Sequence, residues 1–557
     1  MDLVAGLERT VAFFGHAGGE RTRTAKQQVR RRGSQPGPAH GFMMDRRACA
    51  KSAWRTHIRR STENPRKPPM TRRLALILLV PTLTLGATWT GCARNPVTGK
   101  SELSLVSESQ EIQMGQQASK EVAQTIGLYN DAKVQSYVAD IGKRMAAESE
   151  RPNLPWEFHV VDDAAVNAFA IPGGFIYVTR GLMSSINTEA ELASVLGHEI
   201  AHVTHRHSVQ QISKAQLAQL GLGIGSILSS DIARFGQLAG AGLGILFLKY
   251  GRDAENQADQ SGFRYALQQN YDVREMPKVF QTLNRIGEAG GGGGKLPEWL
   301  STHPNPENRI ERTEKMLDTL SVDESKLIID REEYLRHIQG MTFGEDPRQG
   351  YFEGSRFYHP QMRFQLRFPE QWKKQNLPQA VVAVSPSQDA IIQLGLAGQT
   401  PPQQAARQFL SQQGVQAGDA STTSINGLPA ASSYFQAQTE QGNIQGIVSF
   451  ISYGGQTFGL MGYTPAGKLG AYDQVFQNTI RSFSELRDAS KINVQPARVE
   501  LVKVPREMTL EQFNAQYPST APIEHLAIIN ELEGPSSVIP AGQLVKRVVG
   551  GRRVESS

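Results

Sequence analysis

The 557-residue chain contains only two cysteines, Cys49 and Cys92. Two cysteines cannot provide a disulfide framework or a four-cysteine zinc site, so disulfide-stabilised folds and zinc-ribbon folds are excluded. Aromatic residues are also sparse, at 7%. The chain is nevertheless long enough for roughly two to four domains with substantial hydrophobic cores.

A basic folded surface is missing as well, although the formal net charge is +6. Residues 1–69 carry 15 lysines and arginines against 5 acidic residues, which leaves 44 basic and 48 acidic residues for 70–557. The body of the chain is therefore mildly acidic, and we expect no nucleic-acid partner. The first 69 residues are rich in arginine, glycine, proline and serine. They are either disordered or precede a true start at Met70.

Hydrophobic runs of about 20 residues, the length that spans a bilayer, are lacking. Residues 70–92 instead have the layout of a secretory signal, with a cationic start, an apolar run and a small-residue end at Gly91-Cys92. This end resembles a bacterial lipoprotein signal, in which Cys92 is lipidated and becomes the mature N-terminus. A cleaved signal without lipid and a retained anchor are the alternatives. Ala93 favours the outer membrane, by resemblance to enterobacterial sorting.

Residues 93–340 are expected to form the first domain, mainly helical with a small sheet. A polar helical pattern predicts a helix over 107–126, and apolar periodicity predicts helices over 133–148 and 189–207. Strand patterns cover 158–161 and 175–179.

Two further stretches of this domain have unusual compositions. The apolar stretch 215–248 fits either a buried helical hairpin or a membrane-leaning flap. Gly290–Gly294 predicts a flexible loop.

His198-Glu199-Ile200-Ala201-His202 lies inside the predicted helix 189–207. Positions i and i+4 share one face of a helix, so both imidazoles can bind one ion, while Glu199 can reach a water in its open position. A catalytic zinc uses three protein ligands and a water. The pattern predicts a zinc metallopeptidase with one Zn2+ per chain and Glu199 as its general base.

The missing third ligand is expected from a second helix. Glu255 and Asp259 are again four residues apart. Glu255 can complete the coordination, and Asp259 can accept the outer N–H of a ligand histidine. Arg252 and His303 are the candidates for stabilising the oxyanion that develops during peptide hydrolysis.

His303 lies between the polyglycine run and Pro304, on a segment that can swing. Three roles are open for it: a fourth ligand that closes the site, a catalytic role in the transition state, or a purely structural one. His205 and His207, at the end of the first helix, are expected to interact with the helix dipole.

Several stretches between about 95 and 320 match a known pattern: 95–99, 167–170, 172–182, 197–202, the Glu255-x-x-x-Asp259 helix and 301–304. On these motifs the chain resembles the HtpX-like and CAAX-endoprotease-type metallopeptidase family, in its periplasmic BepA-like branch. The resemblance implies a gluzincin fold, with His198, His202 and Glu255 as zinc ligands and Glu199 as the catalytic base. It also implies a sheet edge that pairs with an extended substrate. The residues expected at this edge are Gly174, Phe175, Ile176 and Tyr177.

Two smaller units are expected after the catalytic one. Residues 345–487 alternate strand-like runs with turns and end in a helix, which predicts an α/β sandwich-like domain resembling PsbP and Mog1. Residues 498–550 resemble a LysM-like βααβ module, which implies peptidoglycan as a partner. Arg506-Glu507 replaces the Gly-Asp pair common in such modules. The whole chain is thus predicted to be an α+β multidomain protein.

Two functions fit this reading. The first is a periplasmic endopeptidase, lipid-anchored to the outer membrane, that removes misfolded or stalled envelope polypeptides and works with the outer-membrane assembly machinery. The second is a chaperone or scaffold for that assembly, with a largely latched zinc site. A peptidoglycan hydrolase fits less well, because an edge strand suits an extended polypeptide better than a short cross-linked stem peptide.

Overall fold

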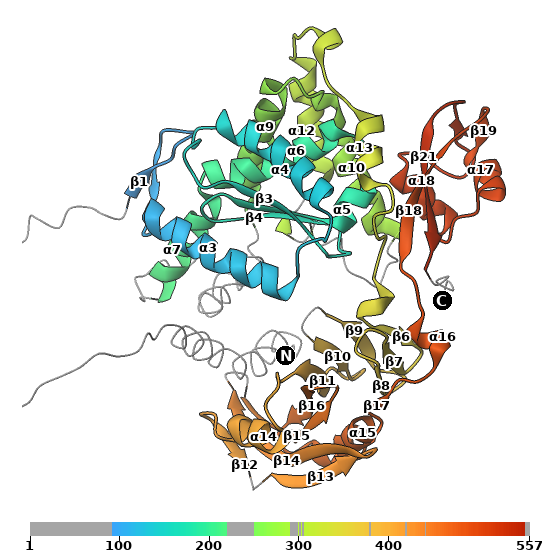
Figure 1. Cartoon of the computed structure of the whole chain (residues 1–557). Coiled ribbons are helices and arrows are strands. Elements are labelled where there is room, and N and C mark those ends of the chain that lie inside the picture. The colour runs from blue at the N-terminus through green and yellow to red at the C-terminus, as the bar shows by residue number, and fades with distance from the viewer. Residues whose placement is uncertain are drawn as a thin grey trace, which may run out of the picture. The chain divides into compact units, whose positions relative to one another are not determined.

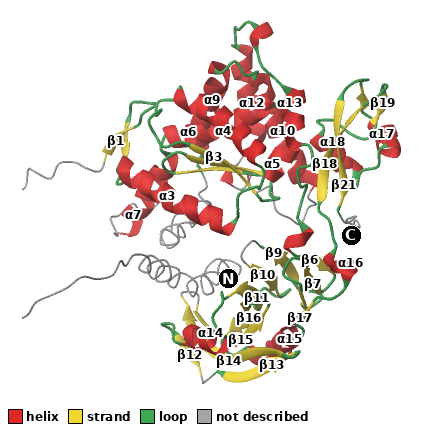
Figure 2. Cartoon of the chain, in the orientation of Figure 1, coloured by secondary structure: helices red, strands yellow, loops and turns green. Residues whose placement is uncertain are grey.

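The computed structural model describes residues 92–219, 250–289, 299, 302–303, 306–377, 380–417, 420–439 and 442–551. The predictions for 1–69, for most of the signal segment, for 220–248 and for the glycine run lie outside these residues. No helix in the described part is long and apolar enough to cross a membrane. Figure 2 shows helices dominating the first part of the chain and strands dominating the part that follows.

The first domain is a set of helices around a small sheet (Figure 1). It opens with the hairpin of β1 (Cys92–Arg94) and β2 (Ser101–Leu103). The predicted helices are present, and the third divides at Arg206, whose φ is 59°. The helices are α3 (Glu108–Thr125), α4 (Ala132–Ala147), α5 (Arg180–Ser185), α6 (Glu189–Thr204), α7 (His207–Gln219), α9 (Arg252–Gln268), α10 (Met276–Ala289), α12 (Pro306–Asp318) and α13 (Arg331–Ile338).

The small sheet has three strands in the order β3-β5-β4. These are β3 (Glu157–Val161), β4 (Ala168–Ile171) and β5 (Phe175–Thr179). The central strand, β5, is parallel to β3 and antiparallel to β4. The expectation that Gly174, Phe175, Ile176 and Tyr177 form a sheet edge is therefore wrong, because both sides of β5 are already paired. The edge strand that packs against α6 is β4.

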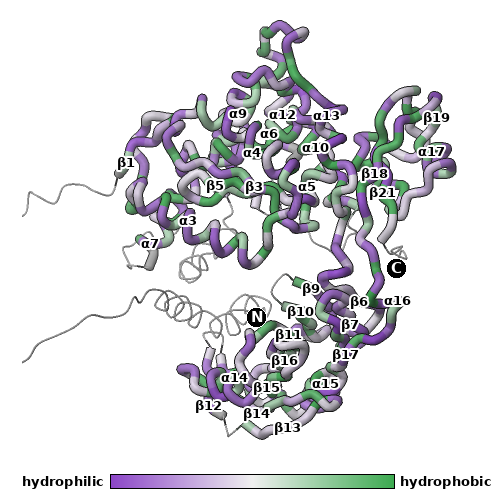
Figure 3. Tube along the Cα trace, viewed as in Figure 1, coloured by the Kyte–Doolittle hydropathy of each residue, from purple (hydrophilic) through white to green (hydrophobic). Residues whose placement is uncertain are grey.

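The core of the first domain lies between this sheet and α6. Every residue of α6 is buried, and Leu196 and Ile200 belong to the same hydrophobic cluster as Ile176 and Val178 of β5. Figure 3 shows hydrophobic segments where α5 and α6 meet the sheet. A capping box fixes the start of α6, because Thr188 and Glu191 bond each other's backbone N–H groups.

The second domain, between about 350 and 486, contains an eight-stranded and a four-stranded sheet. The larger sheet follows the order β12-β14-β15-β16-β11-β10-β9, with β13 also paired to β14, and the smaller follows β17-β8-β7-β6. Helix α14 (Pro402–Leu410) packs on one hydrophobic cluster and α15 (Leu469–Arg481) on another.

The strands of the second domain are short at its start and long in its central hairpins. They are β6 (Tyr351–Glu353), β7 (Arg356–His359), β8 (Phe364–Arg367), β9 (Lys373–Asn376), β10 (Ala380–Val384), β11 (Ile391–Leu396), β12 (Val415–Ala417), β13 (Ser421–Ile425), β14 (Leu428–Thr439), β15 (Gly442–Tyr453), β16 (Gln456–Pro465) and β17 (Ser484–Glu485).

The C-terminal module follows the short α16 (Ala489–Ile492). It consists of β18 (Ala497–Lys503), β19 (Met508–Thr509), α17 (Leu510–Gln516), α18 (Ile523–Ile529), β20 (Val538–Ile539) and β21 (Leu544–Gly550). Strands β18 and β21 are antiparallel, and β19 pairs with β20. The α+β multidomain prediction is confirmed, while the LysM-like assignment of this module stays a prediction.

Candidate active site and metal centre

Four potential metal ligands converge in the first domain: His198 and His202 from α6, Glu255 from α9, and His303. One donor atom from each lies within 4.8 Å of the others, and all four side chains are almost fully buried. Buried imidazoles and a carboxylate at such distances are typical of a metal site rather than of an apolar core.

The two helices can present these groups because two glycines let them touch. A Cβ atom on Gly197 of α6 would lie 2.8 Å from the carbonyl oxygen of Gly262 in α9. A Cβ atom on Gly262 would lie 2.7 Å from the backbone nitrogen of His198. Larger residues at either position would push α6 and α9 apart and separate the histidines from Glu255.

The separations between the donor atoms fit one zinc ion. Nε2 of His198 lies 3.0 Å from Nε2 of His202 and 3.3 Å from Nδ1 of His303. Nδ1 of His303 lies 2.9 Å from Oε1 of Glu255, whose two oxygens lie 3.6 and 3.7 Å from the other two histidines. Ligands at about 2.0–2.1 Å from a tetrahedral zinc are roughly 3.4 Å apart. The five separations are therefore close to those between ligands of one zinc ion.

Two buried charged residues, Asp259 and Arg309, contact the ligands of this cluster. Nδ1 of His198 lies 3.1 Å from Oδ1 of Asp259, as expected for the outer nitrogen of a metal ligand. Arg309 forms a two-pronged ion pair with Asp259 and lies 3.3 Å from Oε2 of Glu255. Burial alone would raise the pKa of Asp259, but Arg309 and His198 hold that pKa far below its usual value.

The sequence did not single out Arg309, which is completely buried. Its guanidinium lies over the rings of Phe280 and Trp299, at 4.2 and 4.3 Å from their centroids. Its position on α12 could have indicated its burial. Arg309 lies four residues before the buried Thr313, so the two residues share the inward face of that helix.

The outer nitrogen of His202 also has a buried partner. Its Nδ1 lies 3.0 Å from Nδ1 of His207, whose Nε2 lies 3.1 Å from Oε1 of Gln257. Tyr250 stacks on the His202 ring at 4.0 Å. The expectation for His207 is wrong: it does not end α6 but begins α7, and it supports the site. Burial lowers its pKa to about 3, which keeps the imidazole neutral.

Glu199 is fully buried, and neither of its carboxylate oxygens has a hydrogen-bond partner in the described part of the chain. The nearest cationic candidate is His303, with Nε2 at 3.7 Å from Oε1. Burial raises the pKa of Glu199, while His303 and His198 oppose the rise. A buried carboxylate without partners is costly in a structural role and is typical of a catalytic acid or base.

The structure does not bring Arg252 to this cluster. It is the exposed first residue of α9, and no hydrogen bond or ion pair among the described residues joins it to the four ligands. Cys92 begins β1 opposite Leu103, and its lipidation stays a prediction.

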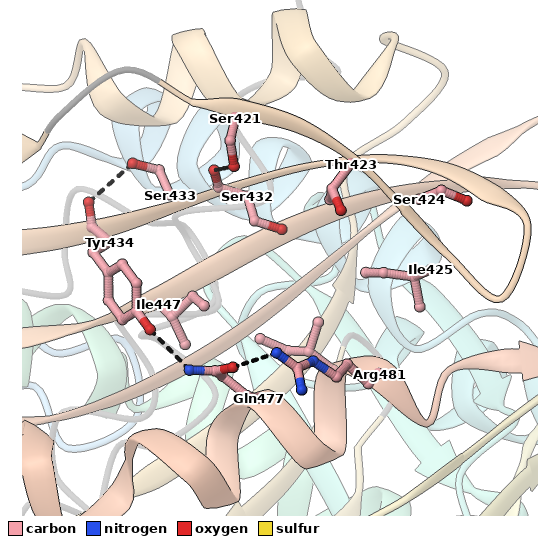
Figure 4. Close-up of a pocket in the computed structure, with 11 residues that line it drawn as sticks. Ser421, Thr423, Ser424, Ile425, Ser432, Ser433, Tyr434, Ile447, Gln477 and Arg481 are labelled. Carbon is pink, nitrogen blue, oxygen red and sulfur yellow. Dashed lines mark hydrogen bonds between the residues drawn. The ribbon is translucent and has the colours of Figure 1, made fainter.

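A cavity of about 440 Å3 lies away from this cluster, between β13, β14 and α15 of the second domain (Figure 4). Its polar groups are mainly serine and threonine hydroxyls. On its wall, Gln477 donates to the hydroxyl of Tyr434 and Arg481 donates to Gln477. None of its lining residues is an aspartate, glutamate or histidine that could activate these hydroxyls, so the cavity is not a candidate active site.

A buried HExxH helix joined to a glutamate on a neighbouring helix defines the chain as a metalloendopeptidase, and comparison with known proteins agrees. The model of peptidase family M48 matches residues 132–317. Mitochondrial metalloendopeptidase OMA1 of Schizosaccharomyces pombe is 33% identical over 41% of this chain and 67% of its own length. The chain belongs to peptidase family M48.

A bacterial relative shares less of its length with this chain. The beta-barrel assembly-enhancing protease of Escherichia coli K12 is 30% identical over 39% of this chain, which spans 45% of that relative. Among solved structures, the PsbP protein of Synechocystis sp. PCC 6803 aligns at 13% identity with a TM-score of 0.21, covering 24% of this chain and 94% of that one. A score of this size carries no argument, so the PsbP/Mog1-like assignment of 345–487 stays a prediction.

Proposed function

We propose that this metalloendopeptidase is a zinc enzyme of the bacterial cell envelope that hydrolyses misfolded or stalled envelope polypeptides. The observation that carries the proposal is the meeting of three buried ligands, His198, His202 and Glu255, beside the unpartnered carboxylate of Glu199. These three residues would hold the zinc ion. When bound, zinc would polarise the scissile carbonyl and make a nearby water more acidic.

Glu199 supplies the proton transfers in this proposal. Its carboxylate takes a proton from the attacking water and later delivers it to the leaving amine. The raised pKa of Glu199 suits this double role, because the group must hold the proton between the two steps. Its burial also excludes bulk water that would compete for the proton.

An extended substrate would add to the edge of β4. Among the described residues this strand is paired on one side only, with β5, and it packs against α6, which carries His198 and Glu199. Backbone hydrogen bonds along such an edge recognise an unfolded polypeptide with little dependence on its sequence.

His303 would act as a latch in the resting enzyme. Its Nδ1 lies near both Glu255 and His198, in the place of a fourth ligand, and its Nε2 faces Glu199. In this position it covers the site that a water and a substrate carbonyl need. Trp299 stacks on the His303 ring at 4.8 Å and would leave with it when the site opens.

The envelope location rests on two supports. One is the secretory-signal layout of 70–92 with Cys92 as the lipid attachment site at the outer membrane. The other is the likeness to the beta-barrel assembly-enhancing protease of E. coli. Unfolded envelope polypeptides, the outer-membrane assembly machinery and, through the LysM-like module, peptidoglycan are the proposed partners.

The closed arrangement of His303 favours a second candidate, a chaperone or scaffold for outer-membrane protein assembly whose zinc site is mostly latched. Glu199→Gln separates the two functions in cells that depend on this protein. If proteolysis is the function, the variant fails to relieve envelope stress although it accumulates to the wild-type level. Full rescue by Glu199→Gln would overturn the proteolytic function and support the scaffold.

A further inference from the structure

Lys546 of β21 is completely buried, and its side chain reaches out of the C-terminal module into the first domain. Its Nζ donates hydrogen bonds to the carbonyl oxygens of Ser184, Ser185 and Ile186, at 3.1, 3.2 and 2.8 Å. An ammonium group has three N–H donors, and these three carbonyls satisfy all of them. All the hydrogen-bond donors of the Lys546 ammonium group are therefore used in the contact with the first domain.

The three carbonyls lie directly before the active-site helix. Ser184 and Ser185 end α5, and Ile186 is its C-terminal cap. The last carbonyls of a helix have no partners inside it, and here the C-terminal module supplies the donor. Thr188, two residues after Ile186, is the N-terminal cap of α6. His198 follows ten residues later, about 15 Å along the helix.

Further contacts hold the same pair of surfaces together. Nδ2 of Asn187, beside Thr188, donates to Oε1 of Glu531 at 2.9 Å. The side chain of Asn530 bonds both the backbone N–H and the carbonyl of Lys546, which fixes the strand from which the lysine extends. Helix α18 packs against α5 and α10. The docked surface thus has both an apolar part and a set of directed hydrogen bonds.

Burying a lysine is a costly way to dock two surfaces. Burial lowers the pKa of Lys546 to about 7, and Arg331 acts in the same direction, while Glu191 and Glu531 oppose them. An apolar side chain of similar size would dock the module without this cost. Unlike an apolar side chain, the lysine holds the three consecutive carbonyl groups of Ser184, Ser185 and Ile186 in place through hydrogen bonds.

We propose that Lys546 is a positioning residue for the active-site helix: by holding the carbonyls of Ser184, Ser185 and Ile186, the C-terminal module fixes the turn from which α6 begins. The zinc centre then reaches its catalytic geometry only with the module docked. This inference rests on the proposed zinc-peptidase function, and it gives the C-terminal module a role in catalysis beyond that of a partner-binding appendage.

The test compares Lys546→Met with Lys503→Met in the full-length protein. Methionine keeps an apolar stem like that of lysine and lacks the terminal ammonium group with its N–H donors. Lys503 is an exposed lysine of β18 in the same module. Both variants and the wild type are loaded with Co2+ in place of zinc. The readouts are the visible absorption spectrum of the cobalt protein, its cobalt affinity, and kcat and KM for cleavage of casein after zinc loading.

The proposal expects an altered cobalt spectrum in Lys546→Met and a kcat lowered on the order of tenfold or more, with KM less affected. Lys503→Met should match the wild type. A variant that melts at a lower temperature but keeps the wild-type spectrum, affinity and kcat while folded would overturn the proposal.

A second variant covers the case in which Lys546→Met does not fold. Glu531→Ala keeps Lys546 but removes the contact with Asn187 and the interaction of Glu531 with Glu191 of α6. It should shift the same spectrum in the same direction by a smaller amount. An unchanged spectrum in Glu531→Ala would then overturn the proposal. If the wild type binds cobalt but cleaves no polypeptide, the endopeptidase function fails, whereas the spectra still decide the role of Lys546.

Discussion

Nδ1 of His303 lies 2.9 Å from Oε1 of Glu255, so a residue from the far end of the first domain reaches the third ligand of the candidate zinc centre. The contact joins two elements that are 48 residues apart in the chain. It places His303 among the four potential metal ligands. In the proposed latch, His303 takes the position that a catalytic zinc keeps open for water.

Replacing His303 by alanine should open the site. We expect His303→Ala to cleave casein faster than the wild type, because the open position is no longer covered. Its zinc affinity should fall roughly tenfold, since one of four donors is lost. Cleavage assays and chelator competition measure the two effects, with His159→Ala, a partly exposed histidine of β3, as the control. Unchanged cleavage together with unchanged affinity would remove any active role for His303.

Arg309 should be essential for the stability of the metal-free protein. Arg309→Met leaves Asp259 buried without its two-pronged partner, which should lower the free energy of unfolding by about 3–5 kcal/mol. Arg312 approaches the same carboxylate at 3.3 Å but is one-third exposed. Arg312→Met should therefore cost less than about 1 kcal/mol. Chemical denaturation of both variants measures the difference, and equal losses would contradict the central position of Arg309.

Asp259 should act on the metal through His198. Asp259→Asn keeps the shape of the side chain but weakens the acceptor for Nδ1 of His198. We expect the zinc affinity to fall between about 10-fold and 100-fold. The matched control is Asp253→Asn, an exposed aspartate in the first turn of the same helix. Chelator competition that gives the same affinity for both variants would show that Asp259 does not support the ligand.

Acid should destabilise the metal-free protein through His205. This side chain is buried beside Ser261, and burial lowers its pKa from 6.5 to about 4. Below about pH 6.5 His205 is protonated in the unfolded chain, whereas in the folded chain it stays neutral down to about pH 4. The free energy of unfolding should therefore fall across this window, by at most about 3 kcal/mol from this group. Denaturation of the wild type and His205→Gln in chelator should give curves that diverge toward pH 4; parallel curves would contradict the assignment.

The sequence predicted the features that depend on local pattern. The helix carrying His198 and His202 was expected from its apolar periodicity, and Glu255 and Asp259 from their four-residue spacing. The position of β5 within its sheet could not be read locally, because it depends on β4, whose Ala168–Ile171 shows no alternation of polar and apolar residues. Arg309 was missed for a related reason: its role exists only once α12 lies against α9.

The break between α6 and α7 could not be predicted from the sequence either. Arg206 adopts a positive φ, and this reversal sends His207 back toward His202. An arginine is not a residue type that signals such a turn. The docking of Lys546 onto the carbonyls before α6 depends on residues about 360 positions apart. Contacts of that range carry no signal in a single sequence.

The most direct test of the active-site assignment measures zinc content and casein cleavage together in the wild type and in Glu199→Gln. We expect one zinc per chain in both proteins, chelator-sensitive cleavage by the wild type, and a loss of cleavage on the order of 100-fold or more in the variant. Cleavage by Glu199→Gln at the wild-type rate, or a wild type that cleaves equally well without metal, would contradict the assignment of this site.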